Sequence, residues 1–391
     1  MKRAIGIGLA MLLILAGVGF FGVAPGVVER TMNVVQPGEL PEVSAETAEL
    51  HRTLHLVDMH ADTLMWQRDL LSETWQGQVD LRRLEAGNVA LQIFSSVTKT
   101  PKGQNYDANG EDSDNITLLT IAQLQPPWTW TSLLQRSLFH AEKLQKAEAG
   151  SNGRLRIVRS GADVQTLIAD RVAGKTVTGA LLSIEGLQDL EGKATNLDVL
   201  YKAGFRMAGP AHFFDNELAG SMHGLKKGGL RPLGRQVIQA MESKGMIVDI
   251  AHASHQSVAD ILAMATRPVV SSHGGVQATC KVNRNLTDDE IRGVARTGGV
   301  IGIGYWEGAI CDTSTEAVAD AIAHVRDLVG VKHVGLGSDF DGAVTTRWDA
   351  SQLAAVTQAL VDRRFTPSEI RAVMGGNVIR LLEQGLVPKQ P

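Results

Sequence analysis

Several features are scarce or absent in this sequence of 391 residues. It has no run rich in lysine or arginine, and its formal net charge of -4 is nearly balanced, which argues against a nucleic-acid-binding protein. It has no internal repeat and no low-complexity segment. Only two cysteines are present, Cys280 and Cys311, so the chain can form one internal disulfide, and two buried free thiols are the alternative.

Long apolar runs are also rare, with one exception at the amino terminus. No charged residue occurs from Ala4 to Val28, and this run is long enough to cross a bilayer. A lysine and an arginine precede it, which favours a cytoplasmic amino terminus. The small-residue pattern GVA is a poor cleavage site because Pro25 follows it, and no lipobox cysteine is present. We therefore expect residues 1–28 to be an uncleaved signal anchor, and a cleaved signal peptide is the alternative.

Beyond the anchor, short apolar runs alternate with amphipathic helical patterns. The apolar runs are mostly continuous, which is typical of parallel strands buried on both faces. This alternation predicts a (β/α)8 barrel over residues 51–391, preceded by a linker over residues 29–50. Strands are predicted at 54–60, 89–97, 179–186, 205–212, 246–252, 267–273, 298–306 and 333–340, and helices at 161–173, 232–244, 255–264, 287–296 and 315–329.

Two of these helices have recognisable start signals. Ser254 precedes one of them, and Thr287 has Glu290 three residues later, which is the spacing of a capping box. The polar stretch 98–130 interrupts the pattern after the second predicted strand and contains YDANGEDSDN. We expect an excursion there, either as a rim of the functional site or as a disordered surface loop.

Imidazole and carboxylate groups follow the ends of the predicted strands. Barrel active sites are built at this carboxyl-terminal face from residues of several strands. Imidazoles and carboxylates together suit zinc or a similar divalent ion, and a site with two metals needs one carboxylate that both can share. His212 and Asp339 end two further strands. Five residues are predicted as metal ligands: His60, Asp62, Glu185, His252 and His273.

These residues stand within motifs that resemble those of a known family. The motifs are DMHADT, SIEG, PAHFFDNELAGSMHG, DIAHAS, SSHGG and GSDFDG. In this order they resemble the membrane (renal-type) dipeptidases, peptidase family M19, from about residue 45 to the carboxyl terminus. The resemblance implies a metal-dependent (β/α)8 barrel that holds two zinc ions and hydrolyses small dipeptides, and it leaves open whether these include dipeptides with a D-residue at the carboxyl end.

The resemblance also implies a role for each metal ligand. His60 and Asp62 would hold one zinc ion, and His252 and His273 would hold the other. Glu185 would bridge the two ions.

Further residues match the catalytic and substrate-binding positions of the family. His212 matches a substrate-binding histidine, and Asp339 matches the acidic residue that transfers a proton. Arg284, in CKVNRNLTDDEIR, matches the arginine that binds the terminal carboxylate of the substrate, and Tyr305 matches a substrate-contacting tyrosine more loosely. The two cysteines match a disulfide pair of the mammalian members.

The chain departs from the mammalian members in its membrane attachment. Those members carry a lipid anchor at the carboxyl end, but LLEQGLVPKQP offers no hydrophobic tail for one. The loop PAHFFDNE is closer to bacterial members. We therefore expect a bacterial inner-membrane protein with its catalytic domain in the periplasm, or a periplasmic protein if the signal is cleaved. Relatives are often dimers, so a homodimer is a further expectation.

Two other functions remain as alternatives. Another dinuclear zinc hydrolase of amides or lactones, such as a deacetylase or a β-lactam-opening enzyme, would keep both metals but would not need Arg284. A tethered binding or scaffolding protein on the same barrel would be expected to lack metal ligands, and none of the five is missing.

Overall fold

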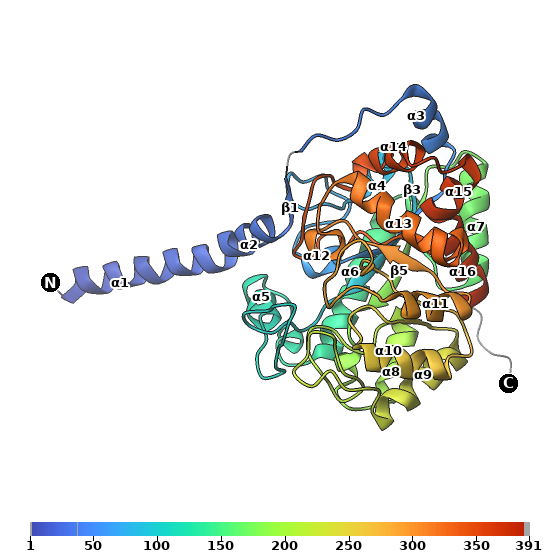
Figure 1. The fold of residues 1–391 in the computed structure, drawn as a ribbon. Coiled ribbons are helices and arrows are strands. Elements are labelled where there is room, and N and C mark those ends of the chain that lie inside the picture. The colour runs from blue at the N-terminus through green and yellow to red at the C-terminus, as the bar shows by residue number, and fades with distance from the viewer. Residues whose placement is uncertain (1, 37, 387–391) are drawn as a thin grey trace.

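The computed structural model describes residues 2–36 and 38–386, and its centre is a parallel β-barrel (Figure 1). The hydrogen-bonded strand order is β8-β7-β6-β5-β3-β2-β10-β9. An isolated parallel bridge between Ser271 and Ile301 links the two end strands, so the ring is nearly closed. The strands are β2 (Leu56–Ala61), β3 (Val89–Ser96), β5 (Thr178–Ile184), β6 (Phe205–Ala208), β7 (Ile247–Asp249), β8 (Val269–Val270), β9 (Ile301–Ile303) and β10 (Val334–Leu336).

All eight barrel strands fall within or beside the ranges that the sequence predicts, and the predicted (β/α)8 barrel is confirmed. Most of the observed strands end earlier than predicted, because the chain turns into the active-site loops while its sequence is still apolar. One strand was not predicted: β4 (Leu155–Ile157) pairs in parallel with the first half of β5. Its three residues are too few to show the hydrophobic pattern of a strand in the sequence.

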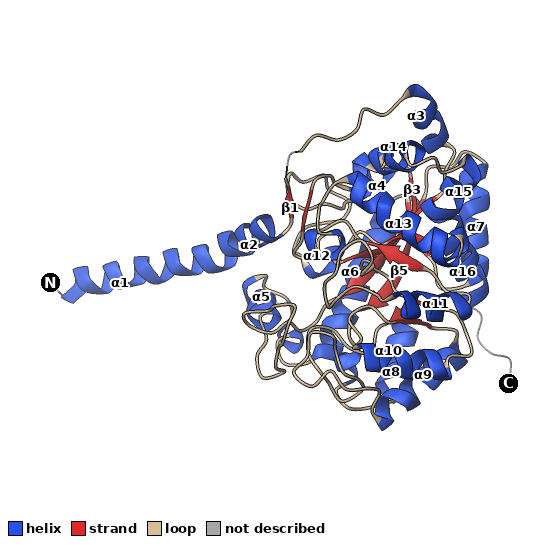
Figure 2. Ribbon diagram, viewed as in Figure 1, coloured by secondary structure: helices blue, strands red, loops and turns tan. Residues whose placement is uncertain are grey.

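Helices surround the barrel (Figure 2). Val164 and Leu167 of α7, with Leu381 of α16, pack in one apolar cluster with Leu91 and Leu181 of the strands. The helices are α3 (Ala45–Arg52), α4 (Leu81–Ala86), α6 (Leu133–Gly150), α7 (Gly161–Val172), α8 (Asn196–Ala203), α9 (Pro232–Lys244), α10 (His255–Met264), α11 (Asp288–Arg296), α12 (Glu307–Ile310), α13 (Thr315–Val329), α14 (Ala354–Asp362), α15 (Pro367–Arg371) and α16 (Asn377–Gly385).

The five predicted helices are present, and both predicted start signals are confirmed. The Ser254 hydroxyl accepts a hydrogen bond from the backbone N–H of Ser257 at the start of α10. Thr287 and Glu290 form a reciprocal capping box at the start of α11. These side chains satisfy backbone N–H groups that have no partner within the first helical turn.

The amino-terminal segment forms one long helix that projects from the barrel (Figure 1). It comprises α1 (Lys2–Gly17), a π-helical turn (Val18–Val23) and α2 (Ala24–Met32). Its apolar part, Ile5–Met32, is long enough to cross a membrane. The predicted linker 29–50 has structure of its own, because it contains the end of α2, the short strand β1 (Val34–Val35) and the start of α3. Strand β1 pairs in parallel with β11 (Thr345–Thr346) outside the barrel.

The polar excursion 98–130 is folded and stands beside the amino-terminal helix. It contains α5 (Ile116–Ala122) and a 3-10 turn (Pro127–Thr129). The buried guanidinium of Arg136, on α6, donates hydrogen bonds to the Thr98 carbonyl and pairs with Asp114 at 2.7 Å. The excursion is therefore held on the barrel, and it contributes residues to the site described next.

Candidate active site

The seven imidazole and carboxylate residues lie together at the carboxyl end of the barrel. None is more than 8% exposed. His252 and Asp339 have positive φ angles of 65° and 61°, a conformation that non-glycine residues seldom adopt and that concentrates at functional sites. The residues are His60 in β2 and Asp62 after it, Glu185 after β5, His212 after β6, His252 after β7, His273 after β8 and Asp339 after β10.

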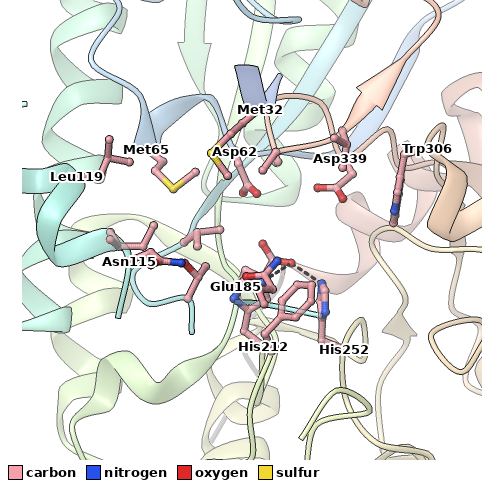
Figure 3. A pocket seen from close by; sticks show the side chains of 18 of the residues that line it. Met32, Asp62, Met65, Asn115, Leu119, Glu185, His212, His252, Trp306 and Asp339 are labelled. Atoms are coloured by element: carbon pink, nitrogen blue, oxygen red, sulfur yellow. Dashed lines mark ion pairs between the residues drawn. The ribbon is translucent and has the colours of Figure 1, made fainter. Parts of the chain in front are cut away.

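Glu185 lies at the centre of this cluster (Figure 3). Its Oε1 atom is 2.6 Å from Nε2 of His252 and 3.2 Å from Nε2 of His273. Its Oε2 atom is 3.4 Å from Nε2 of His60, which is also 3.4 Å from Oδ1 of Asp62. The two oxygens of one carboxylate therefore face two groups of ligand atoms, as a shared ligand between two ions requires.

His212 and Asp339 lie against the same cluster, at slightly longer distances than the predicted ligands. Nε2 of His212 is 3.5 Å from Oε1 of Glu185, and Oδ1 of Asp339 is 3.8 Å from Nε2 of His60. Three overlapping groups have ligand atoms within 4.8 Å of one another: His60, Glu185 and His273; Glu185, His212 and His252; and His60, Asp62 and Asp339.

The unpaired polar atoms of the cluster suit a metal centre. Among the residues that the structure describes, Nε2 of His60, Oδ1 of Asp62 and Oε2 of Glu185 are buried without a hydrogen-bond partner. A buried polar atom without a partner costs free energy, and a cation between these three atoms would satisfy them all. Imidazole nitrogens and carboxylate oxygens are also the ligands of catalytic zinc sites. The residues present therefore fit a bound metal.

The electrostatics of His252, His273 and Glu185 favour metal ligation. Burial lowers the pKa of His252 and His273 well below the ordinary histidine value, so both imidazoles are neutral and can present a lone pair. Burial alone would raise the pKa of Glu185, but neighbouring imidazoles, His212 foremost, outweigh it and hold that pKa well below its ordinary value. Burial raises the pKa of Asp339 well above that of an exposed aspartate.

Arg284 lies beside the cluster without a carboxylate partner. Its side chain is buried, with Nη2 3.4 Å from Nε2 of His252 and its guanidinium carbon 4.4 Å from the ring centroid of Trp306. No Asp or Glu among the described residues forms an ion pair with it. A buried guanidinium without a carboxylate in direct contact is a ready site for an anionic ligand, since its planar donors match a carboxylate.

A cavity of about 410 Å³ opens over these groups (Figure 3). This volume is in the range of small-molecule sites. One part of the wall is polar and carries the catalytic candidates, whereas the part formed by α2, α5 and the loop after β2 is apolar. The polar wall carries Asp62, Glu185, His212, His252, Arg284 and Asp339.

Tyr305 does not line this cavity. It is fully buried, and its ring packs against Phe340 at 5.5 Å and Trp348 at 5.2 Å between centroids. The next residue, Trp306, faces the cavity instead. Successive residues of an extended segment point to opposite sides, so only one of the two can reach the site. The geometry thus places Trp306, and not Tyr305, where the substrate would lie.

Several functional candidates have no strand-end signal in the sequence. Tyr106 belongs to the excursion, lines the cavity, and its hydroxyl accepts a hydrogen bond from Nε1 of Trp306 at 3.0 Å. Phe213 lines the cavity and stacks on His223, with centroids 4.5 Å apart. Burial lowers the pKa of His223 to about 3, so this histidine is a neutral support for Phe213 and Tyr106. An aromatic residue inside the polar run YDANGEDSDN was the only available signal for Tyr106.

Cys280 and Cys311 form a disulfide, as the resemblance implied. It joins the segment before Arg284 to the end of α12, and Trp306 lies between them in sequence. The bond therefore closes a loop that contains the two residues whose side chains stack at the edge of the cavity.

Comparisons with curated proteins identify relatives over most of the chain. Dipeptidase aclJ of Aspergillus oryzae is 35% identical over 349 residues, which cover 84% of this chain and 77% of the relative. Dipeptidase tcpJ of Claviceps purpurea is 28% identical over 345 residues, which cover 85% of this chain and 75% of the relative.

Solved structures share the fold. A metallopeptidase from Rhodobacter sphaeroides, solved with a phosphinate mimic of the dipeptide L-Ala-D-Ala, superposes with a TM-score of 0.70 at 22% identity, covering 85% of this chain and 99% of its own. PvdM from Pseudomonas aeruginosa gives a TM-score of 0.72 at 20% identity, covering 88% and 98%. The family model described as membrane dipeptidase (peptidase family M19) matches residues 44–388. With that match over most of its length, the chain belongs to the membrane dipeptidase family, peptidase family M19.

Proposed function

We propose that this metallo-dipeptidase uses two zinc ions that share Glu185, and that it recognises its substrate by the free carboxylate. The observation that carries the proposal is the buried guanidinium of Arg284, which has no carboxylate partner among the described residues and faces the same cavity as Glu185. A metal cluster and a carboxylate-binding group on one cavity are the two elements that cleavage of a short peptide with a free carboxyl end needs.

We assign the ligands to two sets around Glu185. His60 and Asp62 lie on the side of Oε2, and His252 and His273 lie on the side of Oε1. When bound, zinc ions would lower the pKa of a water molecule to about 7 and polarise the scissile carbonyl. Glu185 stays ionised throughout, because its neighbouring imidazoles stabilise the carboxylate.

Arg284 sets the length of the substrate. Its planar donors can bind both oxygens of a terminal carboxylate, and the Trp306 ring on one face holds the guanidinium in place. Nη2 of Arg284 lies only 3.4 Å from Nε2 of His252. A substrate carboxylate bound to Arg284 is therefore separated by one residue from the scissile peptide bond over the metal ligands. A tripeptide would place its carboxylate too far from that bond.

Two side chains are placed to handle charge and protons at the reacting bond. His212 borders the cavity, where its imidazole can stabilise the oxygen that becomes negative as the carbonyl is attacked. Asp339 borders the same space and can take a proton from the attacking water and deliver it to the departing amine. Cleavage then returns Asp339 to its starting state.

The proposed substrates include dipeptides with a D-residue at the carboxyl end. The neighbour from Rhodobacter sphaeroides was solved with a mimic of L-Ala-D-Ala, and its fold matches this chain. Arg284 binds the carboxylate rather than the side chain of that residue, so the configuration at its α-carbon is not selected by this contact.

The amino-terminal helix supports attachment to a membrane. The uncharged part of its apolar segment, from Ile5 to Val28, extends about 36 Å, which exceeds the hydrocarbon thickness of about 30 Å. Leu118, Leu124 and Trp128 are 60%, 63% and 58% exposed on the excursion beside this helix, and such residues favour the membrane interface. We propose an uncleaved anchor with the catalytic domain outside the cytoplasm, in a bacterium at the inner membrane. Mass spectrometry of the mature amino terminus distinguishes it from a cleaved signal.

The role of the carboxylate can be tested with matched substrates. Purified full-length enzyme in detergent would be assayed on L-Ala-L-Ala, L-Ala-D-Ala, L-Ala-L-Ala amide and L-Ala-L-Ala-L-Ala. We expect hydrolysis of both dipeptides. The kcat/KM for the amide and for the tripeptide should be at least about 100-fold lower than for L-Ala-L-Ala, because neither can make the charged contact with Arg284. Equal hydrolysis of the amide would show that the enzyme is a general amide hydrolase.

A further inference from the structure

The end of the amino-terminal helix is fixed to the barrel next to the catalytic cavity. Glu29 of α2 pairs with Arg68, which also pairs with Asp341 in the loop after β10. All three side chains are at most 4% exposed. Buried charges are stable only when they are paired, so this triad holds α2 in one position.

Neighbouring contacts fix the helix on both sides of Glu29. Nε2 of Gln76 donates a hydrogen bond to the carbonyl of Gly26 at 2.9 Å, and the backbone N–H of Ala343 donates one to Oδ1 of Asn33, also at 2.9 Å. The guanidinium of Arg30 lies 5.3 Å from the ring centroid of Trp75. The pairing of β1 with β11 continues this attachment beyond the helix. The helix end is thus a built part of the domain.

The fixed end of the helix contributes two residues to the lining of the catalytic cavity. Val28 and Met32 are four positions apart and so lie on one face of α2. They are 37% and 43% exposed, which places them at the cavity mouth, where a bound side chain would cover them. Together with residues of the loop after β2 and of α5 they form an apolar wall: Val28, Met32, Met65, Ile116 and Leu119.

The apolar wall and the carboxylate-binding arginine lie on opposite sides of the metal ligands. Figure 3 shows Met65 and Leu119 to the left of Asp62 and Glu185, Met32 just above Asp62, and Trp306 to the right. Arg284 stacks on Trp306. A dipeptide with its carboxylate at Arg284 and its peptide bond over Glu185 must therefore direct its amino-terminal residue toward Met32.

We infer that the last turn of the amino-terminal helix is part of the substrate site, and that its wall selects dipeptides with a large apolar side chain on the amino-terminal residue. This inference rests on the proposed dipeptidase function. Val28 and Met32 precede residues 44–388, which match the family. The helix thus adds two side chains to a wall whose other members, Met65, Ile116 and Leu119, belong to the matched domain, and this gives the membrane helix a second role besides attachment.

The first test compares side chains at the wall with a neighbouring control. Full-length Val28→Ala and Met32→Ala variants would be assayed in detergent on Leu-Ala and Gly-Ala. Val27→Ala is the matched control, since Val27 is also 37% exposed on the same helix but does not line the cavity. We expect the wall variants to raise KM for Leu-Ala by about fivefold while KM for Gly-Ala stays unchanged, because only the larger side chain reaches the wall. The control should change neither.

A second test reports occupancy without turnover. Both native cysteines are in the disulfide, so the Met32→Cys variant carries one reactive thiol, and so does the Val27→Cys control. Maleimide labelling would be timed with saturating phosphinate analogues of Leu-Ala or Gly-Ala. We expect the Leu-Ala analogue to slow labelling at position 32 by at least about fivefold, the Gly-Ala analogue to have less effect, and neither to protect position 27.

The outcomes separate the two proposals. Equal hydrolysis of Leu-Ala and Gly-Ala by the wild type, unchanged in the wall variants and with no protection at position 32, would overturn the inference and leave the dipeptidase function standing. A wild-type enzyme that is loaded with zinc but cleaves neither dipeptide would overturn the proposed function and the inference with it.

Discussion

Oε1 of Glu185 lies 2.6 Å from Nε2 of His252, while the second oxygen of the same carboxylate faces away from it, toward His60. One side chain thus joins the two halves of the ligand cluster. This arrangement makes Glu185 the residue on which both proposed metals depend.

The Glu185→Gln variant should lose metal and activity together. An amide keeps the size of the side chain but lacks the charge and the second ligand oxygen. We expect bound zinc to fall from about two ions per chain to one or fewer, and kcat to fall by more than about 100-fold, because even partners of metal ligands contribute 10- to 100-fold. Elemental analysis beside steady-state kinetics measures both. Glu191→Gln, a carboxylate in the same loop whose Oε1 accepts from Ser132, is the control and should retain zinc.

Arg284→Ala should separate substrate binding from metal binding. Loss of the charged contact should raise KM for L-Ala-L-Ala by about 30- to 100-fold, while zinc content stays normal. Arg284→Lys should recover only part of this loss, since an ammonium cannot bind both carboxylate oxygens in one plane. Zinc loss in Arg284→Ala, measured by elemental analysis, would contradict the role proposed for this residue.

The disulfide should stabilise both the fold and the substrate site. Cys280 and Cys311 are separated by 31 positions and close a loop of that size. Replacing both by serine should lower the free energy of unfolding by about 3 kcal/mol, measured by urea denaturation. KM for dipeptides should also rise, because Arg284 and Trp306 lie inside the loop. Wild-type enzyme treated with dithiothreitol is the control and should reproduce both effects.

Asp189 should make stability depend on pH. Burial raises its pKa to about 7, although hydroxyls of Ser137 and Thr98 donate hydrogen bonds to it. The folded state therefore binds a proton that the unfolded state, with its ordinary aspartate pKa, releases. This contribution to stability is complete below pH 4 and is lost as pH rises toward 7.

The Asp189→Asn variant imitates the protonated acid, so it should not lose stability as the pH rises toward 7. We expect its free energy of unfolding to exceed that of the wild type by up to about 4 kcal/mol at pH 8, and the two proteins to be nearly equal at pH 4. Thermal or urea unfolding across this range measures the difference. A constant difference at every pH would mean that Asp189 stays ionised in the fold.

The barrel and the metal cluster were predictable because their signals are local. Most strands are mainly apolar runs, and parallel strands in a barrel bring their carboxyl ends to one rim. His60, Glu185 and His273 could therefore be placed together although they are far apart in sequence. The capping box at Thr287 was equally local, since both partners lie within four residues.

The rest of the site depends on contacts that no local pattern reveals. Met32 reaches the cavity because distant contacts hold its helix there, among them the pairing of Glu29 with Arg68, which is 39 positions away. Tyr106 enters it from a polar excursion whose fold depends on Arg136. The exchange of roles between Tyr305 and Trp306 has the same origin, because the packing of Phe340 and Trp348 decides which ring is buried.

The most direct test of the central claim is metal-dependent hydrolysis of L-Ala-D-Ala and L-Ala-L-Ala by full-length enzyme in detergent. The protein would be assayed as purified, after removal of metal by a chelator, and after titration with zinc. We predict that activity is lost with the metal and returns in proportion to bound zinc, reaching its maximum near two ions per chain. Dipeptide hydrolysis that survives complete metal removal, or full zinc loading without any hydrolysis, would contradict the account.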